Sequence, residues 1–150
     1  MKRGRLDILL IEDDDNDIYF VKRATEQGPA GHTVHAVHDG EEAICYLRGE
    51  GPFADRKKFP LPNIILTDLK MPRMNGFEFL SWVRKHPECR IIPVLMYSSS
   101  HLDADIREAY RLGANSYITK PRGLDELVDL LHATYEYWSR CECPPMPEGC

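Results

Sequence analysis

Four apolar segments of the chain each end at side chains that could take part in chemistry. LDILLI is followed by Glu12 and Asp13, NIILT by Asp68, PVLMY by Ser98, and SYIT by Lys120. If these segments are parallel strands of one sheet, their carboxyl ends lie along one edge, where open α/β sheets bind ligands. We therefore expect three acids, a hydroxyl and an ammonium to form one composite site.

Clustered carboxylates in such a crevice require a balancing cation. Negative charges repel one another strongly where water is excluded, so the three acids are expected to hold a divalent metal ion. Their ligand atoms are all oxygens, which favours the hard ion Mg²⁺ over zinc. With the ammonium of Lys120 beside it, such a metal would suit the negative oxygens of a phosphate group. The residues therefore predict a metal-assisted phosphate site.

Length and composition indicate a single domain. The chain has 150 residues, 43% of them hydrophobic, which is enough for one substantial core. Its formal charge of -5 lacks the basic character of nucleic-acid binders. No apolar segment approaches the roughly 20 residues that cross a bilayer, and the first residues lack the apolar region of a secretion signal. We expect a cytoplasmic protein that binds neither nucleic acid nor membrane.

The elements that must position the composite site alternate along the chain. Apolar runs predict strands at 6–11, 32–37, 63–67, 91–97 and 116–119. Helical spacing and stop signals predict helices between them, and a last helix from about residue 124 to 138. Right-handed crossovers then give an α/β fold with a doubly wound, five-stranded parallel sheet in the order 2-1-3-4-5. We expect one domain over residues 1–140 and a disordered, proline-containing tail over 141–150.

The segments that carry the site resemble a known family. LLIEDD, NIILTDLKMPRMNG, PVLMYSS and YITKP are similar, in order, to the four signature segments of response-regulator receiver domains, the phosphate-accepting partners in two-component signalling. The resemblance covers residues 6–138, and Ser98 and Lys120 follow Asp68 by 30 and 52 residues, as in compact receivers. It implies the flavodoxin-like receiver fold. Four segments together make the match specific, although each alone is weak.

The resemblance implies a role for each acid. Asp68 would be the phosphoacceptor, whose carboxylate attacks the phosphorus of a phosphohistidine on a sensor histidine kinase. Mg²⁺ would bind to Glu12, Asp13, Asp68 and the backbone carbonyl of Lys70. The chain would then catalyse only its own phosphorylation and dephosphorylation and would not be an enzyme toward other substrates.

Lys120 and Ser98 would act on the transferred phosphoryl group. Lys120 would neutralise its oxygens, directed inward by a cis peptide bond to Pro121 that the resemblance implies. Ser98 would donate a hydrogen bond to the phosphoryl group and draw its loop inward, which leaves room for Tyr117 to rotate. This switch would alter the face formed by the last strand and the helices on either side of it.

Several acids and one lysine fall outside this pattern. Asp14, Asp15 and Asp17 follow the first strand at the start of a helix, where acids cap the helix and oppose its dipole, so no ligand role is expected for them. Lys70 stands where many receivers carry Asn, which leaves the lifetime of the aspartyl phosphate open. The long loop at 49–62 resembles single-domain regulators that are paired with phytochrome-type histidine kinases.

The residues of the site are consistent with three kinds of function to different degrees. Only 30 residues follow Lys120, too few for a DNA-binding output domain, so a stand-alone receiver would signal through protein contacts or as a homodimer through the switched face. A phosphatase of the haloacid dehalogenase type would need a second Asp two positions after the nucleophile, where Lys70 stands. A binding module that never accepts phosphate would lack some of the site residues, and none is missing. The receiver function fits best.

Overall fold

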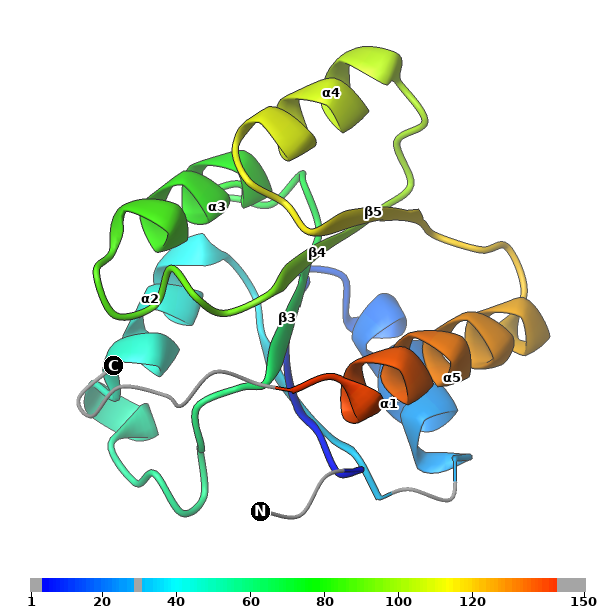
Figure 1. The fold of residues 1–150 in the computed structure, drawn as a ribbon, viewed down its shortest axis with the longest axis horizontal. Coiled ribbons are helices and arrows are strands. Elements are labelled where there is room, and N and C mark those ends of the chain that lie inside the picture. The colour runs from blue at the N-terminus through cyan, green and yellow to red at the C-terminus, as the bar shows by residue number, and fades with distance from the viewer. Residues whose placement is uncertain (1–3, 29–30, 143–150) are drawn as a thin grey trace.

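The computed structural model describes residues 4–28 and 31–142. Over these residues, strands and helices alternate (Figure 1). The strands are β1 (Asp7–Ile11), β2 (Thr33–Val37), β3 (Ile64–Thr67), β4 (Val94–Ser98) and β5 (Ser116–Thr119). The helices are α1 (Asp15–Glu26), α2 (Gly40–Arg48), the short 3-10 helix η1 (Gly51–Phe53), α3 (Gly76–Lys85), α4 (Asp103–Arg111) and α5 (Leu124–Arg140).

The strands form one parallel sheet in the order β2-β1-β3-β4-β5, which confirms the predicted doubly wound fold. Ile11 at the end of β1 pairs with both Val37 and Thr67, and Ser98 at the end of β4 pairs with Thr119. Because the strand ends are aligned in this way, the residues that follow β1, β3 and β5 lie along one edge of the sheet.

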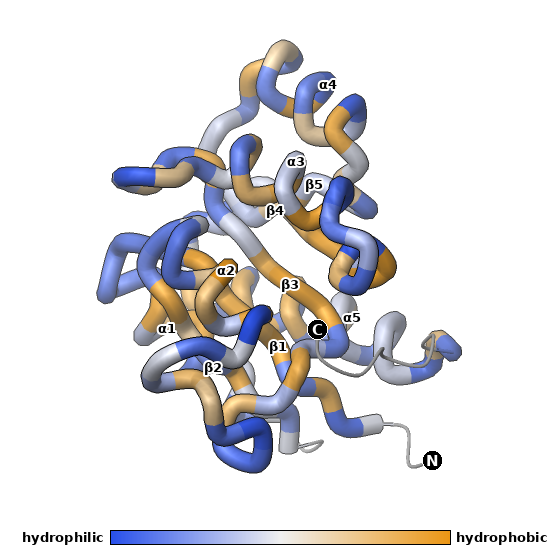
Figure 2. Tube along the Cα trace, turned by 90° about the vertical axis from the view of Figure 1, so that its left-hand side faces the viewer, coloured by the Kyte–Doolittle hydropathy of each residue, from blue (hydrophilic) through white to orange (hydrophobic). Residues whose placement is uncertain are grey.

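The sheet separates two clusters of buried apolar side chains. The helices cover both faces of the sheet (Figure 1), and β1 and β3 are strongly hydrophobic in their sequence (Figure 2). Side chains alternate between the faces of the sheet, so Leu10 contacts the cluster under α1 and α5, whereas Leu9 contacts the cluster under α2, α3 and α4. β3 and β4 are buried along their whole length, and β1 along all but its first residue. Burial on both faces explains why these strands are nearly continuous apolar runs in the sequence.

β4 begins three residues later than predicted. The apolar run starts at Ile91, but Pro93 has no N–H to donate to a strand ladder, and regular pairing starts at Val94. The carbonyl of Pro93 still accepts a hydrogen bond from the amide of Ile65 at 2.9 Å. Ile92 is buried before the strand begins. The apolar run therefore combines the end of a turn with a strand.

The long loop between α2 and β3 is fastened to α2. Arg56 donates to the carbonyls of Tyr46 and Leu47, in the last turn of α2, at 2.8 and 2.6 Å. The rings of Phe53 and Phe59 lie 5.1 and 6.0 Å from the ring of Tyr46, measured between centroids. Since the loop ends where β3 begins, it lies at the edge of the sheet opposite to the composite site.

The C-terminal boundary of the domain stays a prediction. α5 ends at Arg140, and residues 143–150 of the expected disordered tail lie outside the described residues. No helix in the part of the chain that the structure describes has the length and apolar character needed to cross a membrane.

Candidate functional site

Backbone hydrogen bonds continue the sheet one residue past the strand ends and hold the site there. The amides of Glu12, Asp68 and Lys120 donate to carbonyls at the ends of the neighbouring strands β2, β1 and β4, at 2.9, 3.0 and 2.8 Å. The three residues are therefore fixed by the same ladder that orders the strands. The predicted convergence of their side chains is observed at the carboxyl edge of the sheet.

Glu12, Asp13 and Asp68 form an acidic cluster at the centre of the site. One carboxylate oxygen from each residue lies within 4.8 Å of the other two. Glu12 is buried, Asp68 is partly buried and Asp13 is exposed. Burial raises the pKa of Glu12 to about 7, because its charged form loses hydration. A hard divalent cation fits these oxygen ligands and would relieve their repulsion.

Lys120 donates hydrogen bonds to three carboxylates. Its Nζ lies 2.7 Å from Glu12 Oε1, 2.8 Å from Asp17 Oδ2 and 3.0 Å from Asp68 Oδ2. Burial by itself would lower the pKa of Lys120, but the hydrogen bonds to Asp17 and Glu12 outweigh it and raise the pKa above the ordinary value. These hydrogen bonds favour the charged ammonium form of Lys120 inside the site.

The inward direction of Lys120 does not come from a cis proline. No peptide bond among the described residues is cis, so the cis bond expected before Pro121 is wrong. Lys120 directly follows β5, and its amide is held by the carbonyl of Ser98 at the end of β4. This extension of the ladder is sufficient to place the lysine beside Asp68.

Asp68 is held by the loop that follows it. Its Oδ1 accepts a hydrogen bond from the amide of Leu69 at 2.7 Å, and its Oδ2 faces the lysine. A Cβ on Gly76, the first residue of α3, would lie 2.1 Å from the carbonyl oxygen of Asp68. Only glycine therefore allows the start of α3 to approach the backbone of Asp68 so closely. A capping box of Asn75 and Glu78 fixes where this helix begins.

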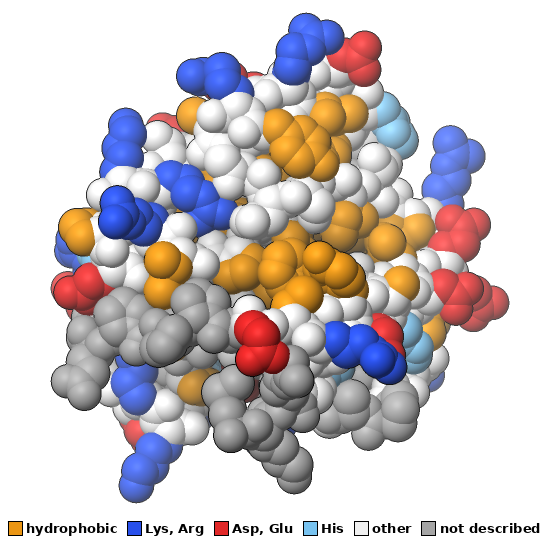
Figure 3. Space-filling model, viewed as in Figure 1, with side chains coloured by type: hydrophobic (Ala, Val, Ile, Leu, Met, Phe, Trp, Pro, Cys, Tyr) orange, Lys and Arg blue, Asp and Glu red, His pale blue; other side chains and the backbone are white. Residues whose placement is uncertain are grey.

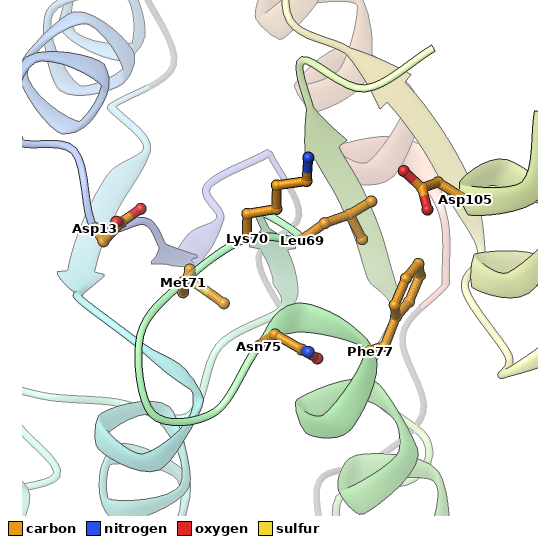
Figure 4. A pocket seen from close by; sticks show the side chains of 7 residues that line it. All are labelled: Asp13, Leu69, Lys70, Met71, Asn75, Phe77 and Asp105. Carbon is orange, nitrogen blue, oxygen red and sulfur yellow. The ribbon is translucent and has the colours of Figure 1, made fainter. Parts of the chain in front are cut away.

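An open hollow of about 530 Å³ lies beside the acidic cluster (Figure 4). It is lined by Asp13, Leu69, Lys70, Met71, Asn75, Phe77 and Asp105. Asp13 and Asp105 lie on opposite sides of the labelled residues in this view, with Lys70 between them. Binding of a metal ion by the Lys70 carbonyl stays a prediction.

Hydrogen bonds tie the loop after β4 to β5 and α4. Ser98 Oγ accepts from the amide of Ser100 at 3.1 Å, and the carbonyl of Ser100 accepts from Tyr117 Oη at 3.0 Å. Ser100 Oγ donates to Asp105 Oδ2 at 2.6 Å. Tyr117 thus contacts the loop that follows Ser98, as a switch pair requires, while the movement itself stays a prediction.

Asp17 belongs to the site, although its sequence position indicated only a helix start. Asp14 caps α1 as expected, since its carboxylate accepts from the amides of Asn16 and Asp17. Helical side chains tilt toward the N-terminus of their helix, which here lies at the carboxyl edge of the sheet. An acid in the first turn after a ligand-bearing strand is therefore the signal that could have identified Asp17.

Comparison with known proteins gives a family match. The model of the response regulator receiver domain family matches residues 8–132. The response regulator Rcp1 of Synechocystis sp. is 31% identical over 131 residues, which cover 87% of this chain and 87% of Rcp1. The matched residues include the whole acidic cluster and Lys120.

Solved structures have the same fold. The phosphorylated cyanobacterial phytochrome response regulator RcpA is 34% identical, with a TM-score of 0.85 over 94% of this chain and 99% of RcpA. The Mn²⁺-bound form of Rcp1 is 30% identical, with a TM-score of 0.81 over 93% and 99% of the two chains. The response regulator RPA3017, in red light signaling of R. palustris, is 30% identical, with a TM-score of 0.87 over 93% and 99% of the chains.

Proposed function

The chain belongs to the response regulator receiver domain family, and on that premise we propose that it is a stand-alone receiver that a sensor histidine kinase phosphorylates on Asp68 in the presence of Mg²⁺. One observation carries this proposal. The Asp68 carboxylate lies 3.0 Å from the ammonium of Lys120 and shares a cluster of oxygen ligands with Glu12 and Asp13. Asp68, Lys120 and the other two acids are thus already close enough together to act as the proposed acceptor, its neutralising cation and a metal site.

The residues of the site would divide the reaction between them. A carboxylate oxygen of Asp68 would bond to phosphorus while the bond from phosphorus to the kinase histidine breaks. Mg²⁺, held by the acidic cluster and the carbonyl of Lys70, would supply positive charge to the phosphoryl oxygens. Lys120 would donate to one of these oxygens and Ser98 to another. The chain would catalyse only its own phosphorylation and dephosphorylation.

The switch would act through the loop after β4. In the structure, the Ser98 hydroxyl oxygen accepts from the Ser100 amide, and Tyr117 Oη holds the Ser100 carbonyl. Movement of Ser98 toward a phosphoryl group would disturb both contacts. Because Ser100 also binds Asp105 in α4, the change would reach α4 and β5 together.

A phytochrome-type histidine kinase is the proposed partner. This rests on relatives that cover nearly the whole chain and are named as phytochrome or red-light response regulators. The proposed output is a protein contact through the face formed by α4, β5 and α5, with a second copy of the chain as one occupant. Hydrophobic side chains gather between α4 and α5 in Figure 3, and Tyr110 and Tyr137 on these helices are 50% and 62% exposed.

Intact mass measurement tests the phosphoacceptor. Wild type and Asp68→Asn are incubated with phosphoramidate and MgCl₂, and wild type alone is expected to gain one phosphoryl mass. EDTA should abolish the gain, because the acidic cluster and the phosphoryl oxygens would then lack their cation. A gain that survives Asp68→Asn would place the acceptor elsewhere. No gain in wild type with any small donor would favour a binding module.

A further inference from the structure

One of the three carboxylate partners of Lys120 lies outside the acidic cluster. An ammonium carries three N–H donors, and the three short contacts of Lys120 go to Glu12, Asp17 and Asp68. Glu12 and Asp68 are accounted for as metal ligands. Asp17 is not, because it comes from α1 and its ligand atoms are not among those that cluster around a possible ion.

The position of Asp17 is set by α1 rather than by a strand. Asp14 caps this helix, which places Asp17 in the first turn with its side chain directed back toward the carboxyl edge. The Asp17 side chain is 36% exposed, whereas that of Lys120 is 13% exposed. Asp17 therefore approaches the ammonium from the solvent side, while Glu12 approaches it from the interior.

An aromatic ring limits the other side of the lysine. The Nζ of Lys120 lies 5.5 Å from the centroid of the Tyr97 ring, and Tyr97 is 4% exposed. Asp17, Tyr97 and Lys120 together line a cavity of about 260 Å³ that also contacts Leu124 in α5. The ammonium is thus bounded by a fixed ring and two carboxylates, which leave one N–H for the acceptor.

From this arrangement we propose that Asp17 is a positioning residue, whose carboxylate and that of Glu12 occupy two N–H groups of Lys120 and so direct the third at Asp68. The inference rests on the proposed function and extends it to a residue on a different element. When a phosphoryl group is attached to Asp68, its oxygen takes the place of Asp68 Oδ2 as the acceptor of that third hydrogen. Asp17 and Glu12 keep their hydrogen bonds in both states.

Two substitutions of Asp17 distinguish an effect of its position from an effect of its negative charge. If the negative charge alone mattered, Asp17→Asn and Asp17→Ala would be phosphorylated equally and faster than wild type, because the donor is an anion. If positioning matters, Asn keeps one acceptor oxygen for Lys120 and Ala keeps none. We expect the maximal rate to fall about threefold in Asp17→Asn and about tenfold in Asp17→Ala, within the range that misplacement of a catalytic group produces.

The test measures the rate of phosphorylation by phosphoramidate with saturating MgCl₂, from intact mass over time at several donor concentrations. The maximal rate is expected to fall in the order wild type, Asn, Ala, while the donor concentration at half-maximal rate stays unchanged, because Asp17 does not contact the donor. Asp15→Ala is the matched control. Asp15 lies in the same first turn, its side chain is 90% exposed, and its ion-pair distance of 3.4 Å is to His38 rather than to Lys120.

The possible outcomes distinguish failure of the inference about Asp17 from failure of the proposed function. Equal maximal rates for wild type and Asp17→Ala would overturn the inference and leave the proposed function intact. Equal acceleration of Asp17→Asn and Asp17→Ala would assign Asp17 a charge effect and also overturn it. A similar loss in Asp15→Ala would attribute the effect to the start of α1. If wild type accepts no phosphoryl group, the proposed function fails, and the inference fails with it.

Discussion

Asp13 is the exposed member of the acidic cluster, and we expect its charge to disfavour folding when no cation is bound. The three hydrogen bonds of Lys120 go to Glu12, Asp17 and Asp68, so Asp13 adds repulsion that the lysine does not directly offset. Sites that bind cations commonly carry such a cost in stability. We therefore expect the Asp13 carboxylate to lower the free energy of unfolding until a cation is bound.

Removal of the Asp13 charge should relieve this repulsion. Without divalent cations, Asp13→Asn is expected to raise the free energy of unfolding by about 1 kcal/mol, the scale of two unit charges roughly 4 Å apart in water. MgCl₂ should stabilise wild type and have little effect on the variant, since a ligand that binds only the native state adds to its stability.

Urea unfolding in EDTA and in MgCl₂ measures both effects, with Asp15→Asn as the control. Asp15 is a nearby acid, the first residue of α1, and its side chain is 90% exposed. An equal gain from MgCl₂ in wild type and Asp13→Asn would show that the metal binds elsewhere.

Among the elements, the start of α3 packs closely against the backbone that follows β3. The amide of Gly76 donates to the carbonyl of Leu69 at 2.9 Å, and the absence of a side chain lets the helix start lie against the Asp68 carbonyl. The helix is therefore part of the support of the acceptor, although it contributes no side chain to the acidic cluster.

Gly76→Ala should show this dependence. The added methyl would collide with the Asp68 carbonyl, so either α3 or the segment after β3 must move. We expect this to lower the free energy of unfolding by about 1–3 kcal/mol. The rate of phosphorylation by phosphoramidate should fall as well, because Asp68 is displaced. Urea unfolding and intact mass over time measure the two effects.

Gly123→Ala is the matched control for this change. Gly123 precedes α5, and a Cβ built there meets no atom within 4 Å. Its stability and rate should stay close to those of wild type. A Gly76→Ala chain with wild-type stability and rate would show that the close approach to Asp68 is not required.

In the molecule as a whole, the proposed phosphoryl site and the proposed output face lie on different parts of the sheet. Asp68 follows the central strand β3, whereas Tyr137 lies on α5 beside an open groove of about 560 Å³ that reaches Ile118 in the edge strand β5. Large exposed aromatic side chains near an edge strand indicate a surface that can be covered by a partner.

Sizing chromatography tests a second copy of the chain as that partner. Beryllofluoride, a mimic of the phosphoryl group, should shift wild type to the dimer, and Tyr137→Lys should weaken the shift because a charge would be buried in the contact. Tyr19→Lys, at a residue of α1 that is 56% exposed, is the matched control and should behave like wild type. Monomeric elution of wild type in both states would exclude this dimer.

The order of the elements and the residues of the acidic cluster could be predicted from sequence patterns. Continuous apolar runs mark buried strands, and a polar residue directly after such a run must lie at the carboxyl edge of a parallel sheet. Asp68 and Lys120 could therefore be assigned to one site without coordinates. The start of β4 was placed too early, because local apolarity does not show where Pro93 interrupts the ladder.

The contacts between these residues, by contrast, depend on how separate elements pack together. Lys120 and Asp17 are 103 residues apart, and their hydrogen bond depends on how α1 is set against the end of β5. The path of Lys120 into the site likewise depends on pairing between β4 and β5 rather than on the bond before Pro121. Spacing along a chain fixes which edge or face a side chain occupies, but only the packing of separate elements sets which atoms meet.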